Sequence, residues 1–173
     1  LDFTLHKDEG NYRGWLNYSV GSVLNRIEGV NRGRFYPATQ DQRHEINLVQ
    51  MYSTGKWDFS STLVYGSGRP YTPRGPIDSD YEIFNIFAVN TQRLPAYRRI
   101  DLAAQYSFKL KKMTGDFGVS IFNVLNFENV QSRHYANVLT EIPEEGEEGN
   151  YELQPLDVTS LGITPNLFFN LRF

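Results

Sequence analysis

The segment RRIDLAAQYSFKL, residues 98–110, alternates apolar and polar side chains along almost its whole length. The apolar positions are Ile100, Leu102, Ala104, Tyr106, Phe108 and Leu110. The positions between them include Arg99, Asp101, Gln105 and Ser107. A period of two residues predicts a β-strand with one apolar and one polar face. The alternation is much longer than the average soluble strand of about 5–6 residues, so we expect an unusually long strand.

The same alternation recurs on both sides of this segment. The seven expected strands cover residues 1–7, 12–27, 41–53, 57–67, 99–110, 116–121 and 161–173. The chain has 11 Tyr and 12 Phe but only 2 Trp, and tyrosine and phenylalanine are favoured both in strands and at membrane–water interfaces. The sequence therefore predicts an all-β, antiparallel fold of about seven long strands.

The connections between these strands alternate in length. Short turns are expected at residues 8–11, 54–56 and 111–115, and long polar loops at 28–40, 68–95 and 126–160. Outer-membrane barrels have short periplasmic turns and longer extracellular loops. We therefore expect part of a transmembrane β-barrel, with the short turns in the periplasm. A soluble β-sandwich, whose strands also alternate, is the competing interpretation.

Composition narrows the classes of function. A formal net charge of −3 argues against nucleic acid as a partner. The chain has no cysteine, which removes disulfides, thiolate metal sites and a catalytic thiol. His6, His44 and His134 lack metal-ligand spacing, and Ser67 is not in a Gly-x-Ser-x-Gly elbow. We therefore expect no enzyme, no metal and no cofactor.

An acidic stretch lies in the last long loop, between residues 141 and 152. Its carboxylates are Glu141, Glu144, Glu145, Glu147, Glu148 and Glu152. A loop that binds divalent cations is one interpretation, since hard cations prefer oxygen ligands. A solvated extracellular loop is the interpretation that we favour.

Five motifs occur in order along most of the chain. They are PATQDQRH at 37–44, VYGSGRPYT at 64–72, RLPAYRRIDL at 93–102, IFNVLN at 121–126 with Asn129, and GITPN at 162–166 with the terminal Phe173. This ordered set resembles the C-terminal barrel region of TonB-dependent outer-membrane receptors of the Bacteroidetes type.

The resemblance implies a barrel of about 22 strands around a plug domain. Residues 1–173 would be its C-terminal part, beginning partway along a strand, and the plug would lie outside this chain. The implied location is the outer membrane of a Gram-negative bacterium. The implied partners are the rest of the barrel and the plug, the TonB complex, the outer-membrane lipid and the assembly machinery.

The implied function is TonB-energised import of a large, scarce substrate, with siderophore, cobalamin, peptide and glycan all open. A small structural or adhesive outer-membrane barrel without TonB coupling is the alternative. An outer-membrane lipase or protease is a third class, which the missing catalytic triad disfavours.

Candidate site residues follow from the expected faces. Charged side chains are costly on a lipid-facing surface, so Arg43, Glu45, Arg99 and Asp101 are expected to face the lumen. There they contact the plug or the substrate path, or form ion pairs that keep the wall polar. Arg69, Tyr71 and Arg74 are candidates for substrate contact at the mouth. The resemblance makes Phe173 an assembly signal.

Overall fold

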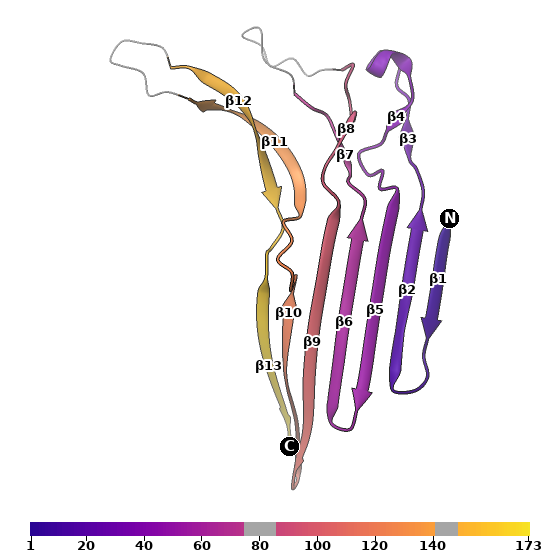
Figure 1. Cartoon of the computed structure of the whole chain (residues 1–173), viewed down its shortest axis with the longest axis vertical. Helices are drawn as coiled ribbons and strands as arrows, with labels where there is room; N and C mark the ends of the chain where they lie inside the picture. Colours follow the sequence, from indigo (N-terminus) through magenta and orange to yellow (C-terminus); the bar gives the residue numbers. More distant parts are fainter. Residues whose placement is uncertain (75–85, 141–148) are drawn as a thin grey trace.

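A computed structural model describes residues 1–74, 86–140 and 149–173 of the chain. Its main element is an antiparallel sheet of seven strands in the order β1-β2-β5-β6-β9-β10-β13 (Figure 1). These strands are β1 (Asp2–Lys7), β2 (Tyr12–Val20), β5 (His44–Thr54), β6 (Trp57–Gly66), β9 (Tyr97–Leu110), β10 (Met113–Phe122) and β13 (Thr164–Arg172). The predicted all-β, antiparallel fold with seven strands is confirmed.

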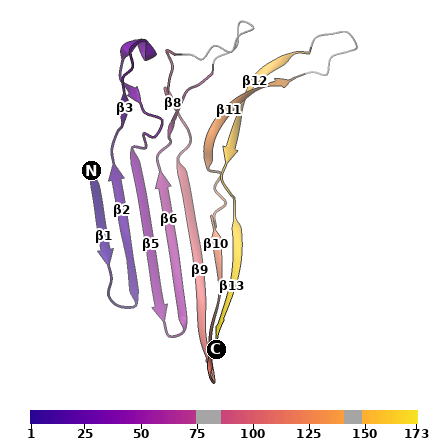
Figure 2. The same cartoon turned by 180° about the vertical axis from the view of Figure 1, so that it is seen from behind.

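The sheet is a single layer. Figures 1 and 2 view it from opposite sides, and neither view shows a second sheet or a helix across it. Among the described residues only Tyr36, Ala38 and Leu94 are buried hydrophobic side chains, and all three lie at the end where the long connections are. A β-sandwich needs a core between two sheets, so this fold is not the soluble sandwich.

The strand registers collect apolar side chains on one side of the sheet. One row of paired positions joins Leu5, Leu16, Leu48, Leu63 and Ile100. The apolar face defined in this way carries Phe3, Leu5, Leu16, Tyr18, Ile46, Leu48, Tyr52, Trp57, Phe59, Leu63, Tyr65, Ile100, Leu102, Ala104, Tyr106, Phe117, Val119, Ile121, Leu167 and Phe169. The predicted alternation therefore extends across all seven strands, with Gln50 and Ser61, which are hydrogen-bonded to each other (3.4 Å), as a polar pair on the apolar side.

The opposite side of the sheet is the polar face. It carries Asn17, Glu45, Asn47, Asp58, Thr62, Arg99, Asp101, Gln105, Asp116, Ser120 and Asn170. Ion pairs and hydrogen bonds link some of these groups, such as Ser107 Oγ to Asp116 Oδ1 at 2.9 Å. Glu45, Arg99 and Asp101 share this face, as their alternation predicts.

Three short turns lie at one end of the sheet, which we call the turn end. They follow β1, β5 and β9, and residues with positive φ, such as Gly10 (84°), Gly55 (60°) and Lys111 (52°), reverse the chain. The turns are staggered. The last pair of the first hairpin, Lys7 and Gly14, lies level with Gln50, four residues before Thr54. Thr54 forms the last pair of the second hairpin with Trp57. Trp57 in turn lies level with Tyr106, four residues before Leu110, which belongs to the last pair of the third hairpin.

Three longer connections lie at the opposite, loop end. They contain the pair β3 (Leu24–Asn25) and β4 (Tyr36–Pro37), the 3-10 turn η1 (Val30–Gly33), the pair β7 (Pro70–Tyr71) and β8 (Gln92–Arg93), and the hairpin β11 (Val130–Leu139) and β12 (Tyr151–Thr159). No helix in the described parts of the chain is long and apolar enough to cross a membrane.

Several predicted boundaries are wrong, and the strands expected from residues 41 and 161 begin at His44 and Thr164. The strand expected to reach residue 27 ends at Val20, because the Val23 amide donates to the Asp41 side chain (2.7 Å) and leaves the ladder. The strand expected from residue 116 begins at Met113, because a two-residue turn suffices after Leu110. The expected loop 126–160 contains the β11–β12 hairpin, whose alternation is obscured by Pro155 and by a bulge between Val130 and Ser132.

Candidate functional site

Three motifs of the sequence meet in one buried ion pair at the loop end. Asp41, which is fully buried, pairs with Arg93 from β8. Arg93 also donates to the carbonyls of Gly68 (2.8 Å) and Asp41 (3.2 Å), and Asp41 accepts from the Val23 amide. This Asp41–Arg93 clasp therefore joins the ends of β2, β5, β6 and β9.

The charge state of the clasp follows from its partners. Burial raises the pKa of the Asp41 carboxyl, but hydrogen bonds from Arg93 and from the Val23 amide, the Arg93 charge and the Ser22 side chain outweigh burial. The pKa of Asp41 therefore lies below its ordinary value of 3.8. The clasp is an ion pair at neutral pH.

Asn90 reinforces the clasp from the same loop as Arg93. It is buried, its Nδ2 donates to the Pro37 carbonyl (2.9 Å) and to Thr39 Oγ1 (3.3 Å), and its backbone N–H donates to Thr72 Oγ1 (3.1 Å). The segment before β8 is thus fixed to the connection between β2 and β5 and to the first part of its own connection.

The two glycines of the Gly66-Ser67-Gly68 motif allow close approaches. A Cβ at Gly66 would lie 1.9 Å from Gln42 Nε2, and one at Gly68 would lie 1.7 Å from the Leu94 carbonyl oxygen. The second contact is with backbone, which cannot move aside without breaking the Leu94 N–H bond to the Arg69 carbonyl (2.9 Å). The motif is therefore needed for packing of the loop end.

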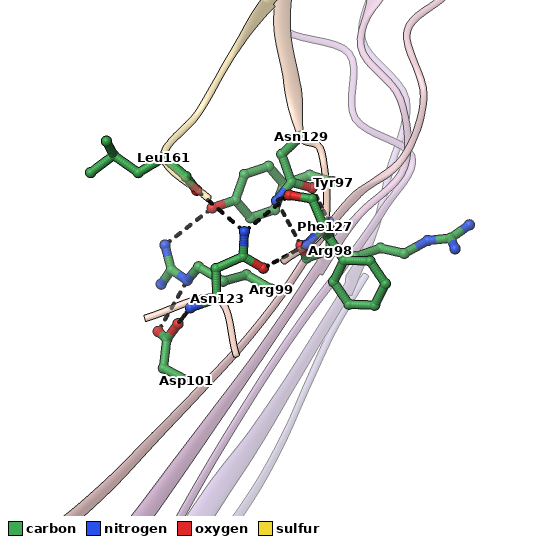
Figure 3. A network of polar contacts seen from close by, with 8 residues as sticks. All are labelled: Tyr97, Arg98, Arg99, Asp101, Asn123, Phe127, Asn129 and Leu161. Carbon is green, nitrogen blue, oxygen red and sulfur yellow. Dashed lines mark hydrogen bonds and ion pairs between the residues drawn. The ribbon is translucent and has the colours of Figure 1, made fainter. Parts of the chain in front are cut away.

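A second network forms where β10 ends (Figure 3). Asn123 is fully buried, with positive φ, and its Nδ2 donates to the carbonyls of Phe127 (3.0 Å) and Leu161 (3.2 Å). Its backbone N–H donates to Asp101 Oδ1 at 2.9 Å. Asn129 Oδ1 and Nδ2 bond the backbone N–H and carbonyl of Arg98, each at 2.7 Å. These asparagines replace missing ladder partners and fix the start of β11.

A hollow lies between the loop end and the polar face, with a volume of about 390 Å³. We call it the inner hollow. Its wall includes Glu45, Asn47, Arg69, Tyr97 and Arg99. Arg99 pairs with Asp101 (Nε to Oδ2, 3.0 Å), donates to the Tyr97 hydroxyl (3.1 Å) and lies 4.6 Å from the centre of the Phe122 ring. Its guanidinium is therefore held in place beside the hollow.

An outer hollow of about 600 Å³ adjoins the first, since Arg69, Leu94 and Gln131 line both. The β11–β12 hairpin supplies one wall through Arg133. This side chain bonds both oxygens of Asp157 (2.6 and 2.7 Å) and donates to the Tyr71 hydroxyl (3.1 Å).

The Arg133 contacts also fix the charges in this wall. The hydrogen bonds to Asp157 and to Tyr71 raise the pKa of Arg133, and the bond from Arg133 lowers the pKa of Asp157. The contact with Tyr71 attaches the hairpin to β7.

The predicted site residues divide into two groups. Glu45 and Arg99 line the inner hollow, Tyr71 lines the outer hollow, and Arg69 lines both. Asp101 lines neither hollow: it accepts a hydrogen bond from the Asn123 backbone N–H and pairs with Arg99. Arg43 is exposed and lines neither of these hollows.

The remaining predicted positions lie outside the hollows. Arg74 adjoins the residues that the structure does not describe and makes contacts of its own. Phe173 is 94% exposed at the turn end. Of the acidic stretch, residues 141–148 lie outside the described part, and Glu152 is exposed on β12.

Sequence reasoning missed Arg133, Gln131 and Tyr97. The first two lie in the β11–β12 hairpin, within the predicted loop 126–160, and Tyr97 precedes the predicted start of its strand at residue 99. The sequence does carry one signal: an arginine in one weakly alternating segment and an aspartate in the next, Arg133 and Asp157, which a hairpin can pair. Nothing in the sequence fixes the register that brings them together.

The arrangement is suited to binding. Both hollows present amides, hydroxyls and guanidinium groups, which hydrogen-bond a polar ligand. Ser132 Oγ lies 3.0 Å from His134 Nε2 on the hairpin, but the described residues show no carboxylate bonded to the other ring nitrogen. Nor do they hold a group of three or more potential metal ligands. No family model, curated protein or solved structure matches this chain.

Proposed function

We propose that this chain is part of the wall of a TonB-dependent outer-membrane receptor, and that the inner and outer hollows contribute to its substrate-binding surface. The observation that carries the proposal is a seven-stranded sheet with one apolar and one polar face, on neither side of which the described residues form a core. A barrel wall has this construction, with lipid on one side and an aqueous lumen on the other.

The exposed area supports this reading. The chain exposes 12801 Å², whereas a folded monomer of its mass of 20.0 kDa would expose about 8,700 Å². Large apolar side chains belong to this exposed surface, and Leu167 and Phe169 on β13 are 80% and 63% exposed. Apolar surface of this extent requires a partner phase or a partner protein.

Aromatic side chains form a belt near the turn end of the apolar face. Trp57 and Tyr106 have ring centroids 4.9 Å apart, Tyr106 and Phe117 5.5 Å, and Phe108 and Phe169 6.2 Å. Such belts are typical of the membrane–water interface. Trp15 lies outside this belt, on the polar face with His6 (6.1 Å between centroids).

The stagger of the turns supports a closed, tilted wall. The last strand pair of each hairpin lies four residues further along the hydrogen-bonded rows than that of the hairpin before it, and the first turn extends from its last pair to Asn11, level with Ser53. A sheet that closes into a barrel needs strands that tilt and a register that steps in one direction. A flat sheet of untilted strands would end its hairpins at one level.

Import, rather than adhesion, is supported by the resemblance of the five motifs to the receptor family. Residues of the first three motifs meet at the loop end, where Gln42, Gly66, Gly68 and Leu94 line the inner hollow and Thr39, Tyr71 and Leu94 line the outer hollow. A purely structural barrel would not need a polar, arginine-lined hollow at this place.

Cysteine mapping on the intact protein tests the topology, because this chain has no cysteine of its own. Arg34→Cys at the loop end should react with a membrane-impermeant maleimide in intact cells. Gly10→Cys at the turn end should react only after the outer membrane is permeabilised, and Leu102→Cys on the apolar face should stay unreactive in both. Equal labelling of the first two positions would overturn the membrane assignment.

Uptake assays separate the receptor from the adhesin. Cells that carry the intact protein are given labelled ferric siderophore, cobalamin, peptide and glycan in turn, with TonB present or deleted. We expect one ligand to accumulate only when TonB is present. Surface attachment that is independent of TonB, with no uptake of any ligand, would favour the adhesive barrel.

A further inference from the structure

We infer that the loop end of the apolar face binds a phosphorylated lipid of the outer leaflet, with Arg98 as the cation that holds its phosphate. The inference rests on the proposed function, because only a membrane-spanning sheet places this part of the face at headgroup depth.

Arg98 is a charged residue on the apolar face. It pairs with Tyr65 across the β6–β9 ladder, and strand alternation puts it on the same side as Ile100 and Leu102. Figure 3 shows its side chain leaving β9 on the side opposite to Arg99 and Asp101. The two adjacent arginines therefore point to different phases, Arg99 to the lumen and Arg98 to the lipid.

The Arg98 backbone is fixed while its guanidinium is free. Asn129 bonds both the backbone N–H and the carbonyl of Arg98, each at 2.7 Å. Within the described part of the chain, the guanidinium has no acidic or hydrogen-bonding partner, whereas Arg93, Arg99 and Arg133 all do. An arginine on a lipid-facing strand costs about 2–4 kcal/mol at the midplane but little near the interface. Arg98 therefore belongs at headgroup level.

A groove of about 530 Å³ begins beside Tyr65, the cross-strand neighbour of Arg98. Its floor is apolar, with Phe3, Leu16 and Ile46, and its upper wall is formed by Tyr18 and His44. The Tyr18 hydroxyl and His44 Nδ1 are 2.9 Å apart, with the rings stacked. An apolar floor that points into the membrane, below polar groups, fits an acyl chain with its headgroup above.

Charge complementarity selects the headgroup. A free guanidinium offers paired N–H donors that match two oxygens of a phosphate, and this pairing strengthens where water is partly excluded. A headgroup of uncharged sugar offers no such partner. The occupant is therefore a phosphorylated lipid whose acyl chain lies along the groove.

The test uses the intact protein, purified from outer membranes in a non-ionic detergent. It is mixed with bis-phosphorylated lipid A, with the same lipid after removal of both phosphates, or with inorganic phosphate and the first lipid together. Native mass spectrometry counts the lipids retained per protein. Arg98→Gln is compared with Arg98→Lys and with Arg34→Gln, which removes an equally exposed arginine from the loop end.

We expect Arg98→Gln to weaken retention of the phosphorylated lipid on the order of tenfold, the loss expected for a charge-assisted hydrogen-bonded pair. Arg98→Lys should restore part of it, and Arg34→Gln should leave it unchanged. Dephosphorylated lipid should bind the wild type and Arg98→Gln equally weakly, and millimolar phosphate should displace little lipid.

Three outcomes would overturn the inference. In the first, the wild type and Arg98→Gln retain the phosphorylated lipid equally. In the second, the wild type retains the dephosphorylated lipid as well as the phosphorylated one. In the third, free phosphate displaces all of the phosphorylated lipid. In each case a protein that still reaches the outer membrane leaves the proposed function standing. If the wild type is not recovered from that membrane, both proposals fail.

Discussion

Asp41 and Arg93 lie 52 positions apart in the sequence and form a buried ion pair at the loop end. A buried charge that loses its partner remains desolvated, so breaking such a pair costs several kcal/mol. We expect Asp41→Asn to destabilise the intact protein by about 2–3 kcal/mol, because Arg93 keeps some solvent contact. Thermal unfolding in detergent measures this. Asp8→Asn, in an exposed pair with His6, is the control and should change stability very little.

The same clasp predicts a dependence on pH. The pKa of Asp41 is lowered in the folded protein, so the folded state binds a proton there less readily than the unfolded state does. The stabilisation is therefore complete above the ordinary value of 3.8 and is lost as the pH falls through the lower folded-state pKa. The stability difference between the wild type and Asp41→Asn should be constant from neutral pH down to about 4 and should shrink below it. A difference that shrinks between pH 7 and 5 would contradict the assignment.

Gly68 is required by a contact with backbone. Gly68→Ala would place a methyl group 1.7 Å from the Leu94 carbonyl oxygen, so β7 and β8 would have to separate. We expect faster hydrogen exchange at residues 68–71 and 92–94 than in the wild type. Gly21→Ala is the matched control, since a Cβ there meets nothing within 4 Å. Equal exchange in both variants would show that the approach is not tight in solution.

The β11–β12 hairpin is the element least supported by its neighbours. A two-stranded hairpin is at best marginally stable by itself, and Arg133 is its described contact with β7, through Tyr71. Arg133→Gln should therefore raise hydrogen exchange throughout residues 130–139 and 151–159 and leave β9 and β10 unchanged. Arg172→Gln is the control, because its ion pair with Asp116 is long (3.8 Å) and its side chain is 77% exposed.

The strands were predictable and the connections were not. A period of two over many residues is a local signal, and it located all seven strands of the sheet within a few residues at most ends. The clasp, the Asn123–Asn129 network and the Arg133 contacts join residues 22–62 positions apart. Such contacts depend on the register between strands, which alternation alone does not fix.

The candidate site was predicted in part for the same reason. Glu45 and Arg99 were assigned to the polar face by alternation, and their place in the wall of the inner hollow follows from it. The predicted strand begins at residue 99, so Arg98 lies just outside it, whereas β9 begins at Tyr97. The position of Arg98 on the apolar face follows from alternation with Ile100 and from its pairing with Tyr65.

The two faces of the whole sheet predict opposite responses to an added charge. Leu102 lies on the apolar face and is 44% exposed, and Gln105 lies on the polar face. Leu102→Arg should cost about 2–4 kcal/mol if it lies near the membrane midplane and should strongly reduce assembly of the intact protein. Gln105→Arg, beside Asp58, should assemble normally. Heat-modifiability of outer-membrane fractions on gels measures assembly, and equal defects would mean that the assigned faces are wrong.

The odd number of strands also gives the sheet a polarity. β1 and β13, the two edges, both run from the loop end to the turn end (Figure 1). If copies of this sheet stood side by side in one membrane orientation, β13 of one copy would meet β1 of the next as parallel strands. Every junction of such a ring would break the antiparallel pattern. A uniformly antiparallel barrel of the kind that we propose would therefore need an odd number of strands besides these seven.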